Sequence, residues 1–485
     1  IHIIVRYRNI LNSHSSTNKA DLIIRNMREM LKPCIFTTLT TIFAFGTLYL
    51  SGIKPIMDFG LMMCTGLVIT LLSSFILLPV LMMKLELKAP QVKSYKKEKS
   101  LFLKLINNYS NFIIFGFVIL LLIGIYGTQQ LKVENSFVNY FKKDTQIHQG
   151  MKLIDDKLGG TTPLDIIIQF KNTSSNEELD EDFLDFGFEY NPEDYWFTKE
   201  KMDLIKNVHD YLDNFEFTGK VLSLASIIRV AEELNADSEF DNLELSVIYK
   251  KIPEDLKAQI LDPYLSIKKN QARITVRMID TNPKLQRNKF INDINDKFKN
   301  EFNNENFEIF TTGILILYNN MLQSLFDSQI LSLGAVMFGI FLMLIFLFKS
   351  LKLAIIAILP NIIACIAILG IMGIGRIPLD LMTITIAAIT IGIAVDNCIH
   401  YVYRFKEEYQ INKDYLKTVL ICDRSVGRAI KSTSTTIIVG FSILVFSNFW
   451  PTIYFGIFTA LAMLIALIGS LTLLPILMIK TRVLK

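Results

Sequence analysis

The sequence predicts a polytopic α-helical membrane protein that carries one α+β domain outside the membrane. Its 485 residues are 51% hydrophobic and have a mean hydropathy of +0.38, which is too apolar for a soluble protein of this length. Eight apolar stretches are long enough to cross a bilayer, which needs about 18 or more apolar residues. A polar stretch of about 200 residues separates the third from the fourth and is long enough for one or two soluble domains.

Hydropathy places the eight spans in order along the chain. Their approximate ranges are 33–53, 56–83, 110–130, 329–348, 351–374, 379–403, 430–449 and 452–479. We expect the chain to be organised as the end of a first membrane repeat at 1–84, a linker at 85–109, one span at 110–131, the outer domain at 132–328 and five spans in 329–485.

Basic side chains in the short loops predict the orientation, because loops rich in Lys and Arg stay in the cytoplasm. Lys84 to Lys104 hold seven Lys and two Glu, and Arg404 to Lys431 hold seven Lys or Arg. The loops that alternate with these hold only Lys54 or only Arg376. We therefore expect the basic linker to be cytoplasmic and the large polar domain to lie outside.

The outer domain is acidic, with 35 acidic and 23 basic side chains in residues 132–328, although the whole chain carries +4. This balance, without a basic aromatic surface, argues against extended contact with nucleic acid. No cysteine falls in this domain, so a disulfide framework there is excluded, and the sequence shows no metal-ligand spacing. We interpret the nine acidic residues of Glu177–Asp194 as a solvated loop or, alternatively, an interaction patch.

The chain repeats itself. LLPVLMMK at 77–84 matches LLPILMIK at 473–480, and PIMDFG at 55–60 matches PTIYFG at 451–456, both with an offset of 396. The opening IHIIVRYR matches IHYVYRFK at 399–406 with an offset of 398. Matching loops fall on the same side of the membrane, which indicates parallel repeats with a site where the halves meet. We expect most of the first repeat, including its own outer domain, to precede Ile1.

Within the outer domain the pattern is strand, helix, strand, given twice. Strands are expected at 164–170, 220–224, 272–279 and 307–311, and helices at 199–215 and 284–302. This order is ferredoxin-like. A helical insertion at about 225–268 separates the two halves.

An aspartate interrupts the apolar run IGIAVDNCIH. Asp396 lies roughly 12 Å before Arg404 along a helix, inside the hydrocarbon. A charged carboxylate there costs about 3 kcal/mol or more, so the neutral acid is favoured and the group suits proton coupling. Asn397 adds a polar neighbour, and His400 lies on the same face one turn later. The alternative is a structural tie between spans.

Hydroxyl side chains on the following span could complete a polar path to this acid. They are Thr433, Ser434 and Thr436, and the first repeat has counterparts at Thr37, Thr38 and Thr40. Ser and Thr also pack transmembrane helices without any chemistry, and both roles stay open.

The sequence resembles the resistance-nodulation-division (RND) superfamily, most closely its MMPL-like, hydrophobe/amphiphile-exporter branch. The resemblance covers nearly the whole chain and is carried by residues 159–170, 312–330, 348–361, 377–408, 427–441 and 451–456. It implies twelve spans, of which this chain shows the tail of the fourth and all of the fifth to the twelfth. It also implies that Asp396 is the coupling acid of the tenth span, whereas many relatives have a second acid where Asn397 stands.

The function implied is export or transfer of lipids or other hydrophobic or amphiphilic molecules at the bacterial inner membrane. The proton gradient drives it without a cofactor, and membrane lipids and a hydrophobic substrate are its partners. A homo-oligomer and a periplasmic partner stay open. Expected path-lining residues, whose alternative role is packing the domain onto the bilayer, are Phe137, Tyr140, Phe141, Tyr318, Met321, Leu322 and Phe326.

Two other functions compete with export. One is a sterol- or lipid-sensing receptor without net transport, and the other is an accessory of protein export. The large outer domain disfavours the accessory. An enzyme of the soluble type is disfavoured because the sequence shows no nucleophile–base pair, metal cluster or phosphate loop.

Overall fold

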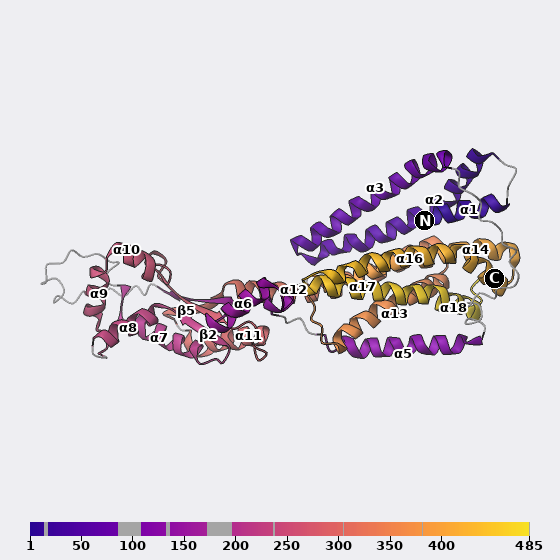
Figure 1. The fold of residues 1–485 in the computed structure, drawn as a ribbon. Coiled ribbons are helices and arrows are strands. Elements are labelled where there is room, and N and C mark those ends of the chain that lie inside the picture. The colour runs from indigo at the N-terminus through magenta and orange to yellow at the C-terminus, as the bar shows by residue number, and fades with distance from the viewer. Residues whose placement is uncertain are drawn as a thin grey trace. The chain divides into compact units, whose positions relative to one another are not determined.

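The computed structural model describes residues 1–13, 18–85, 108–131, 136–171, 196–235, 238–303, 305–380 and 382–484. Two compact units make up the chain: a helical unit, Ile1–Asn135 with Leu322–Lys485, and a sheet unit, Ser136–Met321. Each is drawn as a ribbon in Figure 1. The acidic stretch Glu177–Asp194 lies outside the described residues, as does most of the basic linker.

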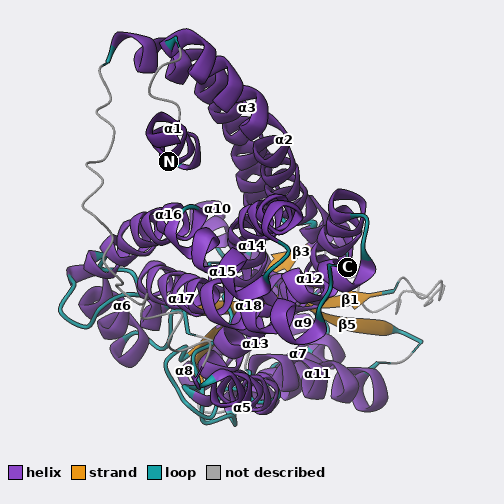
Figure 2. Ribbon diagram, turned by 90° about the vertical axis from the view of Figure 1, so that its right-hand side faces the viewer, coloured by secondary structure: helices purple, strands orange, loops and turns teal. Residues whose placement is uncertain are grey.

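The helical unit contains the eight expected membrane spans. They run over Lys19–Ser51, Lys54–Lys84, Ser110–Thr128, Ile330–Phe348, Leu351–Ile374, Thr383–Asn412, Val426–Phe446 and Trp450–Thr481. The first begins well before the predicted residue 33, because α2 (Lys19–Gly46) includes polar turns before its apolar part. Figure 2 shows helices in purple and strands in orange. Eight spans and a small antiparallel sheet confirm the predicted fold class.

Ten of the described helices either form these spans or, in the case of α1, precede the first of them. They are α1 (His2–Ser13), α2, α3 (Lys54–Lys84), α5 (Ser110–Thr128), α12 (Ile314–Phe348), α13 (Leu351–Ile374), α14 (Ile386–Asn412), α16 (Val426–Ser442), α17 (Trp450–Ile468) and α18 (Leu474–Thr481). A further helix, α15 (Tyr415–Arg424), joins α14 to α16. α14 is central, because 89% of the residues in its most apolar stretch are buried, whereas 6% are buried in the corresponding stretch of α3.

Equivalent residues make the same packing contact within each of the two repeats. A Cβ atom added at Gly60 would lie 2.6 Å from the carbonyl oxygen of Phe45, and one added at Gly456 would lie 2.6 Å from that of Phe441. Rings also meet edge to face in both repeats, Phe45 with Phe59 at 6.0 Å and Phe441 with Phe455 at 5.6 Å. Every one of these residues moves by 396 from one repeat to the other, so the two helix pairs pack in the same way.

Five strands form the antiparallel sheet of the sheet unit. They are β1 (Thr162–Phe170), β2 (Thr218–Leu222), β3 (Leu265–Ser266), β4 (Gln271–Met278) and β5 (Phe307–Thr312). The order is β2-β4-β1-β5, with the short β3 also paired to β4. Helices α7 (Lys199–Asp213) and α11 (Arg287–Lys297) are the two crossovers, so the order along the sheet is that of the predicted ferredoxin-like fold.

Alternation along the strands explains which face is buried. In β4, Ala272, Ile274, Val276 and Met278 are buried, whereas Arg273 between them is exposed. The buried stripe of α7 packs against this face. The predicted insertion forms α8 (Leu224–Leu234), α9 (Asn242–Lys251), α10 (Glu254–Leu256) and η5 (Lys257–Leu261).

Two buried aspartates join the start of the sheet unit to its sheet. Asp155, at the end of α6 (Gln146–Lys157), accepts hydrogen bonds from Thr161, from the Asp280 amide and from Thr281. Asp280 pairs with the buried Arg287 and accepts from the Ser136 hydroxyl at 2.6 Å. Burial alone would raise the pKa of Asp155, but the hydrogen bonds from Thr281, Asp280 and Thr161 outweigh burial and lower the pKa below its ordinary value.

We expect Gly60→Ala and Gly456→Ala each to destabilise the protein by about 1–3 kcal/mol, because a backbone oxygen occupies the space that the new methyl group needs. The measurement is thermal unfolding in detergent. Gly66→Ala and Gly440→Ala are matched controls on α3 and α16, since neither glycine has an atom within 4 Å of the added Cβ, and alanine there is neutral or favourable. Equal melting temperatures for all four variants would contradict the packing.

We expect Asp155→Asn to destabilise the sheet unit by about 3 kcal/mol at neutral pH, because an amide cannot accept all of these hydrogen bonds. The lowered pKa means that Asp155 stabilises the fold above about pH 4 and loses this contribution as the pH falls further. Hydrogen exchange of peptides from β1 and β4 measures the effect. The exposed Asp156→Asn is the control, and acid sensitivity equal to that of wild type in Asp155→Asn would contradict the assignment.

Candidate functional site

The central helix α14 carries the predicted coupling acid. The helix is preceded by a short turn, Thr383–Thr385, whose start is held by Asp380. The Asp380 carboxylate accepts from the backbone amides of Met382 at 2.9 Å and Thr383 at 2.8 Å, so it works as a cap. This cap sets the register of α14, and Asp396 follows in its third turn, part-buried.

The partner of Asp396 comes from the other repeat. Thr41 Oγ1 on α2 lies 3.4 Å from Asp396 Oδ1, 3.2 Å from the carbonyl oxygen of Gly392 and 2.8 Å from that of Thr37. A hydroxyl has one hydrogen, so Thr41 can donate to only one of these three acceptors at a time. The nearest acceptor belongs to its own helix, and the bond to the acid competes with it.

The close contact between α2 and α14 depends on a glycine. A Cβ atom at Gly392 would lie 2.6 Å from the Cβ of Ala44. Small residues let transmembrane helices approach closely, and here the approach brings the Thr41 hydroxyl to α14. Sequence reasoning missed Thr41, although it follows the hydroxyl cluster Thr37–Thr40 and lies one turn after Thr37.

The other polar residue of the pair is held differently. Asn397 Nδ2 donates to Ser434 Oγ on α16 at 3.0 Å, and both side chains are buried. The structure therefore brings Asn397 and Ser434 together. Thr433 Oγ1 can donate to the carbonyl of Ala429 or to that of Ile430, and Thr436 Oγ1 donates to that of Ser432 at 2.9 Å, so these two hydroxyls bond within α16.

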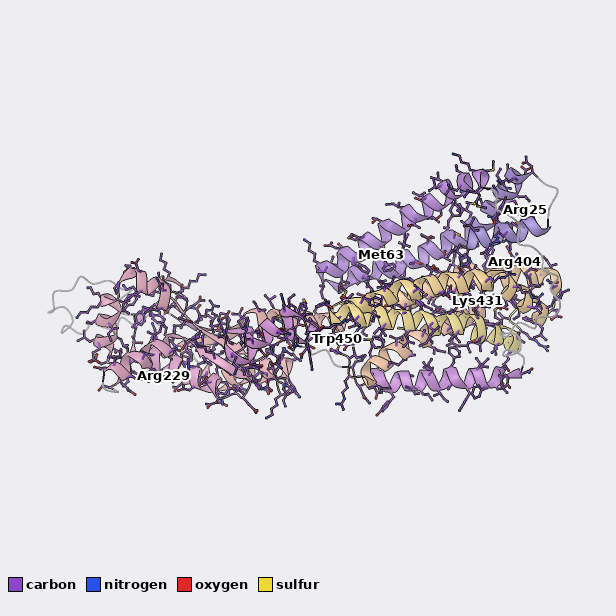
Figure 3. The ribbon with its side chains drawn as sticks, in the orientation of Figure 1. Arg25, Met63, Arg229, Arg404, Lys431 and Trp450 are labelled. Carbon is purple, nitrogen blue, oxygen red and sulfur yellow. The ribbon has the colours of Figure 1, made fainter. Side chains whose placement is uncertain are left out.

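His400, the remaining predicted site residue of α14, lies one turn beyond Asp396. Its ring stacks on that of His2 from α1, and both rings line a cavity of about 40 Å³. The cavity lies at the Arg404 end of the helical unit, the end opposite Trp450 (Figure 3). The basic loops predict this end to be cytoplasmic.

Most of the expected path-lining side chains lie in the sheet unit. Tyr140 Oη and Tyr318 Oη are hydrogen-bonded at 2.8 Å, so these two expected path residues lie together although they are far apart in the sequence. Phe137 is 46% exposed and meets the rings of Tyr140 and Phe141 edge to face. Met321 is part-buried and ends the sheet unit.

Two predicted path residues lie beyond that unit. Leu322 is buried in the helical unit. The side chain of Phe326 lies outside the described residues.

The sheet unit also has an apolar pocket that the sequence did not suggest. It measures about 50 Å³ and lies in the helical insertion, and no charged side chain is among its lining residues. Its walls come from α8, α9 and neighbouring segments and include Phe197, Ile227, Phe240, Leu245 and Tyr249. In the described part of the chain, no cluster of three or more His, Cys, Asp or Glu side chains could hold a metal ion.

Parallel helical repeats, a ferredoxin-like sheet unit and an acid between the repeats define a multi-pass RND-like membrane protein, either a transporter or an accessory of protein export. The family model "MMPL family" matches residues 234–481, more than half of the chain. The chain belongs to the MMPL family, whose members are membrane transporters and not enzymes. The family model "Protein export membrane protein SecD/SecF, C-terminal" matches residues 1–88.

Two individual proteins are similar to this chain. A protein of Methanocaldococcus jannaschii, whose name describes it as a membrane protein, is 25% identical over 363 residues, which are 75% of this chain and 88% of the relative. The crystal structure of SecDF from Thermus thermophilus, a translocon-associated membrane protein, has a TM-score of 0.55 and 10% identity. That match covers 99% of this chain and 52% of SecDF, so the chain spans about half of its length and the likeness concerns the fold alone.

Proposed function

We propose that the chain belongs to an exporter of lipids or other hydrophobic or amphiphilic molecules that the proton gradient drives across or out of the bacterial inner membrane. One observation carries the proposal. Asp396 lies in the central helix at the contact between the repeats, and its hydrogen-bond partner Thr41 belongs to the opposite repeat. A proton on this acid therefore changes a bond between the halves.

The protonation state of Asp396 decides which acceptor the Thr41 hydroxyl binds. A carboxylate only accepts, so Thr41 must turn its single hydrogen from the Thr37 carbonyl to the acid. A protonated Asp396 can itself donate to Thr41 Oγ1, and Thr41 then keeps its 2.8 Å bond to Thr37. The neutral acid satisfies both helices at once, whereas the ionised acid breaks one bond to make another.

This difference supplies the coupling. Hydrogen bonds between transmembrane helices contribute about 0.6–1.7 kcal/mol, and an ionised acid in hydrocarbon costs about 3 kcal/mol or more. A proton can shift the equilibrium between two packings of the repeats only if it binds one packing more tightly than the other. The hydrogen-bond energy and the cost of the ionised acid provide this difference in affinity. The repeats therefore pack differently with and without the proton.

Family membership supports a lipid or amphiphile as the substrate, since the MMPL match covers residues 234–481. The exposed ring of Phe137 and the apolar pocket of the insertion offer apolar surface on the sheet unit. The proposal requires membrane lipids and an apolar substrate as partners and no cofactor. It holds equally for a monomer, a homo-oligomer or a complex with a periplasmic partner.

An accessory of protein export is the second candidate. The match of residues 1–88 to the SecD/SecF model and the fold similarity to SecDF favour it. Both candidates can use Asp396 in the same way, so proton movement alone does not separate them. The two candidates differ in the molecule that is transported, a lipid or a protein.

We expect Asp396→Asn to lower proton flux at least tenfold, because the amide resembles the neutral acid and cannot titrate. Thr41→Val should lower it several-fold by removing the hydroxyl that responds to the proton. The measurement uses the protein in liposomes of host lipid extract with an internal pH dye and an imposed pH gradient. Thr40→Val is the matched control, since Thr40 Oγ1 bonds within α2. Wild-type flux in Asp396→Asn would refute the coupling role.

We expect the same liposomes, loaded with labelled host lipids, to release lipid to an acceptor only under a pH gradient and only with Asp396 intact. A lipid carrier must show this dependence, because the proton and the substrate share one conformational cycle. Gradient-dependent lipid release that is absent from Asp396→Asn supports the exporter. Proton flux without any lipid release would instead favour the protein-export accessory.

A further inference from the structure

Two histidines related by the repeat meet face to face. His2 and His400 differ by 398, the offset of the opening motif, and come from equivalent helical segments. Their ring centroids lie 3.9 Å apart with an angle of 11° between the planes. His400 is 7% exposed and His2 is half-buried, and both rings line the cavity.

A second related pair lies one turn further along. Arg6 and Arg404 also differ by 398, and both bond to Glu407, at 3.4 Å and 3.0 Å. Arg6 also pairs with Glu29 at 2.7 Å. All four side chains line the same cavity as the imidazoles. The cavity therefore lies at the junction of the repeats, and two arginines and two glutamates are among its lining residues.

The stacked geometry limits what the imidazoles can do. Two imidazolium cations with centroids 3.9 Å apart would repel each other, so the stack accommodates one proton at a time. Each neutral imidazole has one protonated and one unprotonated nitrogen, which allows a proton to enter at one nitrogen and leave from the other. His400 is four residues after Asp396 and faces the same side of α14.

We propose that His2 and His400 act as one proton-transfer unit between Asp396 and the cavity. This inference rests on the proposed proton coupling. The Asp396 O–H bond breaks and an N–H bond forms on one of the two imidazoles, which leaves a carboxylate and one imidazolium cation. The opposite nitrogen then releases a proton to water in the cavity, and the pair is neutral again. The reverse sequence loads the acid.

Other titratable groups face the pair and belong in any test. Besides Asp396, they are Cys34 of α2 and Tyr403 of α14, and the Arg6, Glu29, Arg404 and Glu407 cluster borders the cavity. Ser425, which precedes α16, and Val426 and Ala429 on α16 also line the cavity, and none of them is charged. Substitution of the imidazoles leaves all these groups in place, so a change in proton transfer is assigned to the pair.

The first test measures proton flux in liposomes for His2→Gln, His400→Gln and the double variant. Each single substitution should lower flux at least tenfold, and the double variant should be no slower than the slower single variant, because loss of either ring removes the whole unit. Met30→Leu is the control, since Met30 lines the same cavity and cannot titrate. Wild-type flux in both single variants would overturn the proposal.

These variants distinguish a failure of the imidazole pair from a failure of the coupling acid Asp396. If Asp396→Asn abolishes flux and the histidine variants do not change it, the imidazole unit is refuted and the coupling acid stands. If wild-type protein carries no protons, the proposed function fails and the imidazole unit fails with it. If both sets of variants lose flux, both inferences are supported.

A second test does not depend on transport. The protein labelled at its five histidines is titrated in detergent from pH 8 to pH 3, with NMR signals assigned through the single variants. The pair should bind one proton in total, and His400 in His2→Gln should bind one by itself. Complete and independent protonation of both rings in the wild type would overturn the shared unit even if the variants transport slowly.

Discussion

The close approach of α2 to α14 at Gly392 is the contact on which the rest of the helical unit depends. A side chain at this position would overlap Ala44, so the two repeats can touch here only because Gly392 has none. The contact delivers the Thr41 hydroxyl to the carbonyl of Gly392 and to Asp396. A wider spacing would leave the acid without its partner from the other half, and its protonation state would not affect how the halves pack.

Two neighbouring side chains on α14 differ in whether their hydrogen bond to another helix depends on a proton. Asn397 has a neutral partner in Ser434 at 3.0 Å, and neither group titrates, so this bond between α14 and α16 persists in every state. Asp396 faces a hydroxyl that already has an acceptor 2.8 Å away in its own helix. The bond of Asp396 depends on a proton and that of Asn397 does not, although the two residues are adjacent in the chain.

In the sheet unit, hydrogen bonds hold together the two segments through which the chain enters and leaves the unit. Ser136 and Phe137 are bound to Asp280, whose carboxylate also pairs with Arg287. Tyr140 from the entering segment is hydrogen-bonded to Tyr318 at the start of α12. These ties lie beside a ferredoxin-like core whose strands are paired throughout, so both segments start from a rigid base.

The sequence by itself determined the eight spans, the parallel repeats, the ferredoxin-like order and the unusual position of Asp396. Each follows from local patterns: apolar runs of membrane length, an offset of 396, strands that alternate every second residue and one acid in an apolar run. Only the tertiary structure decided the partners. Thr41 rather than Thr433 or Thr436 meets the acid, and His2 stacks on His400, because side chains hundreds of residues apart become neighbours only when helices pack. Spacing along one helix fixes the face that a side chain occupies, but the depth at which two helices meet is set by Gly392 and Ala44 together, and one helix alone does not contain that information.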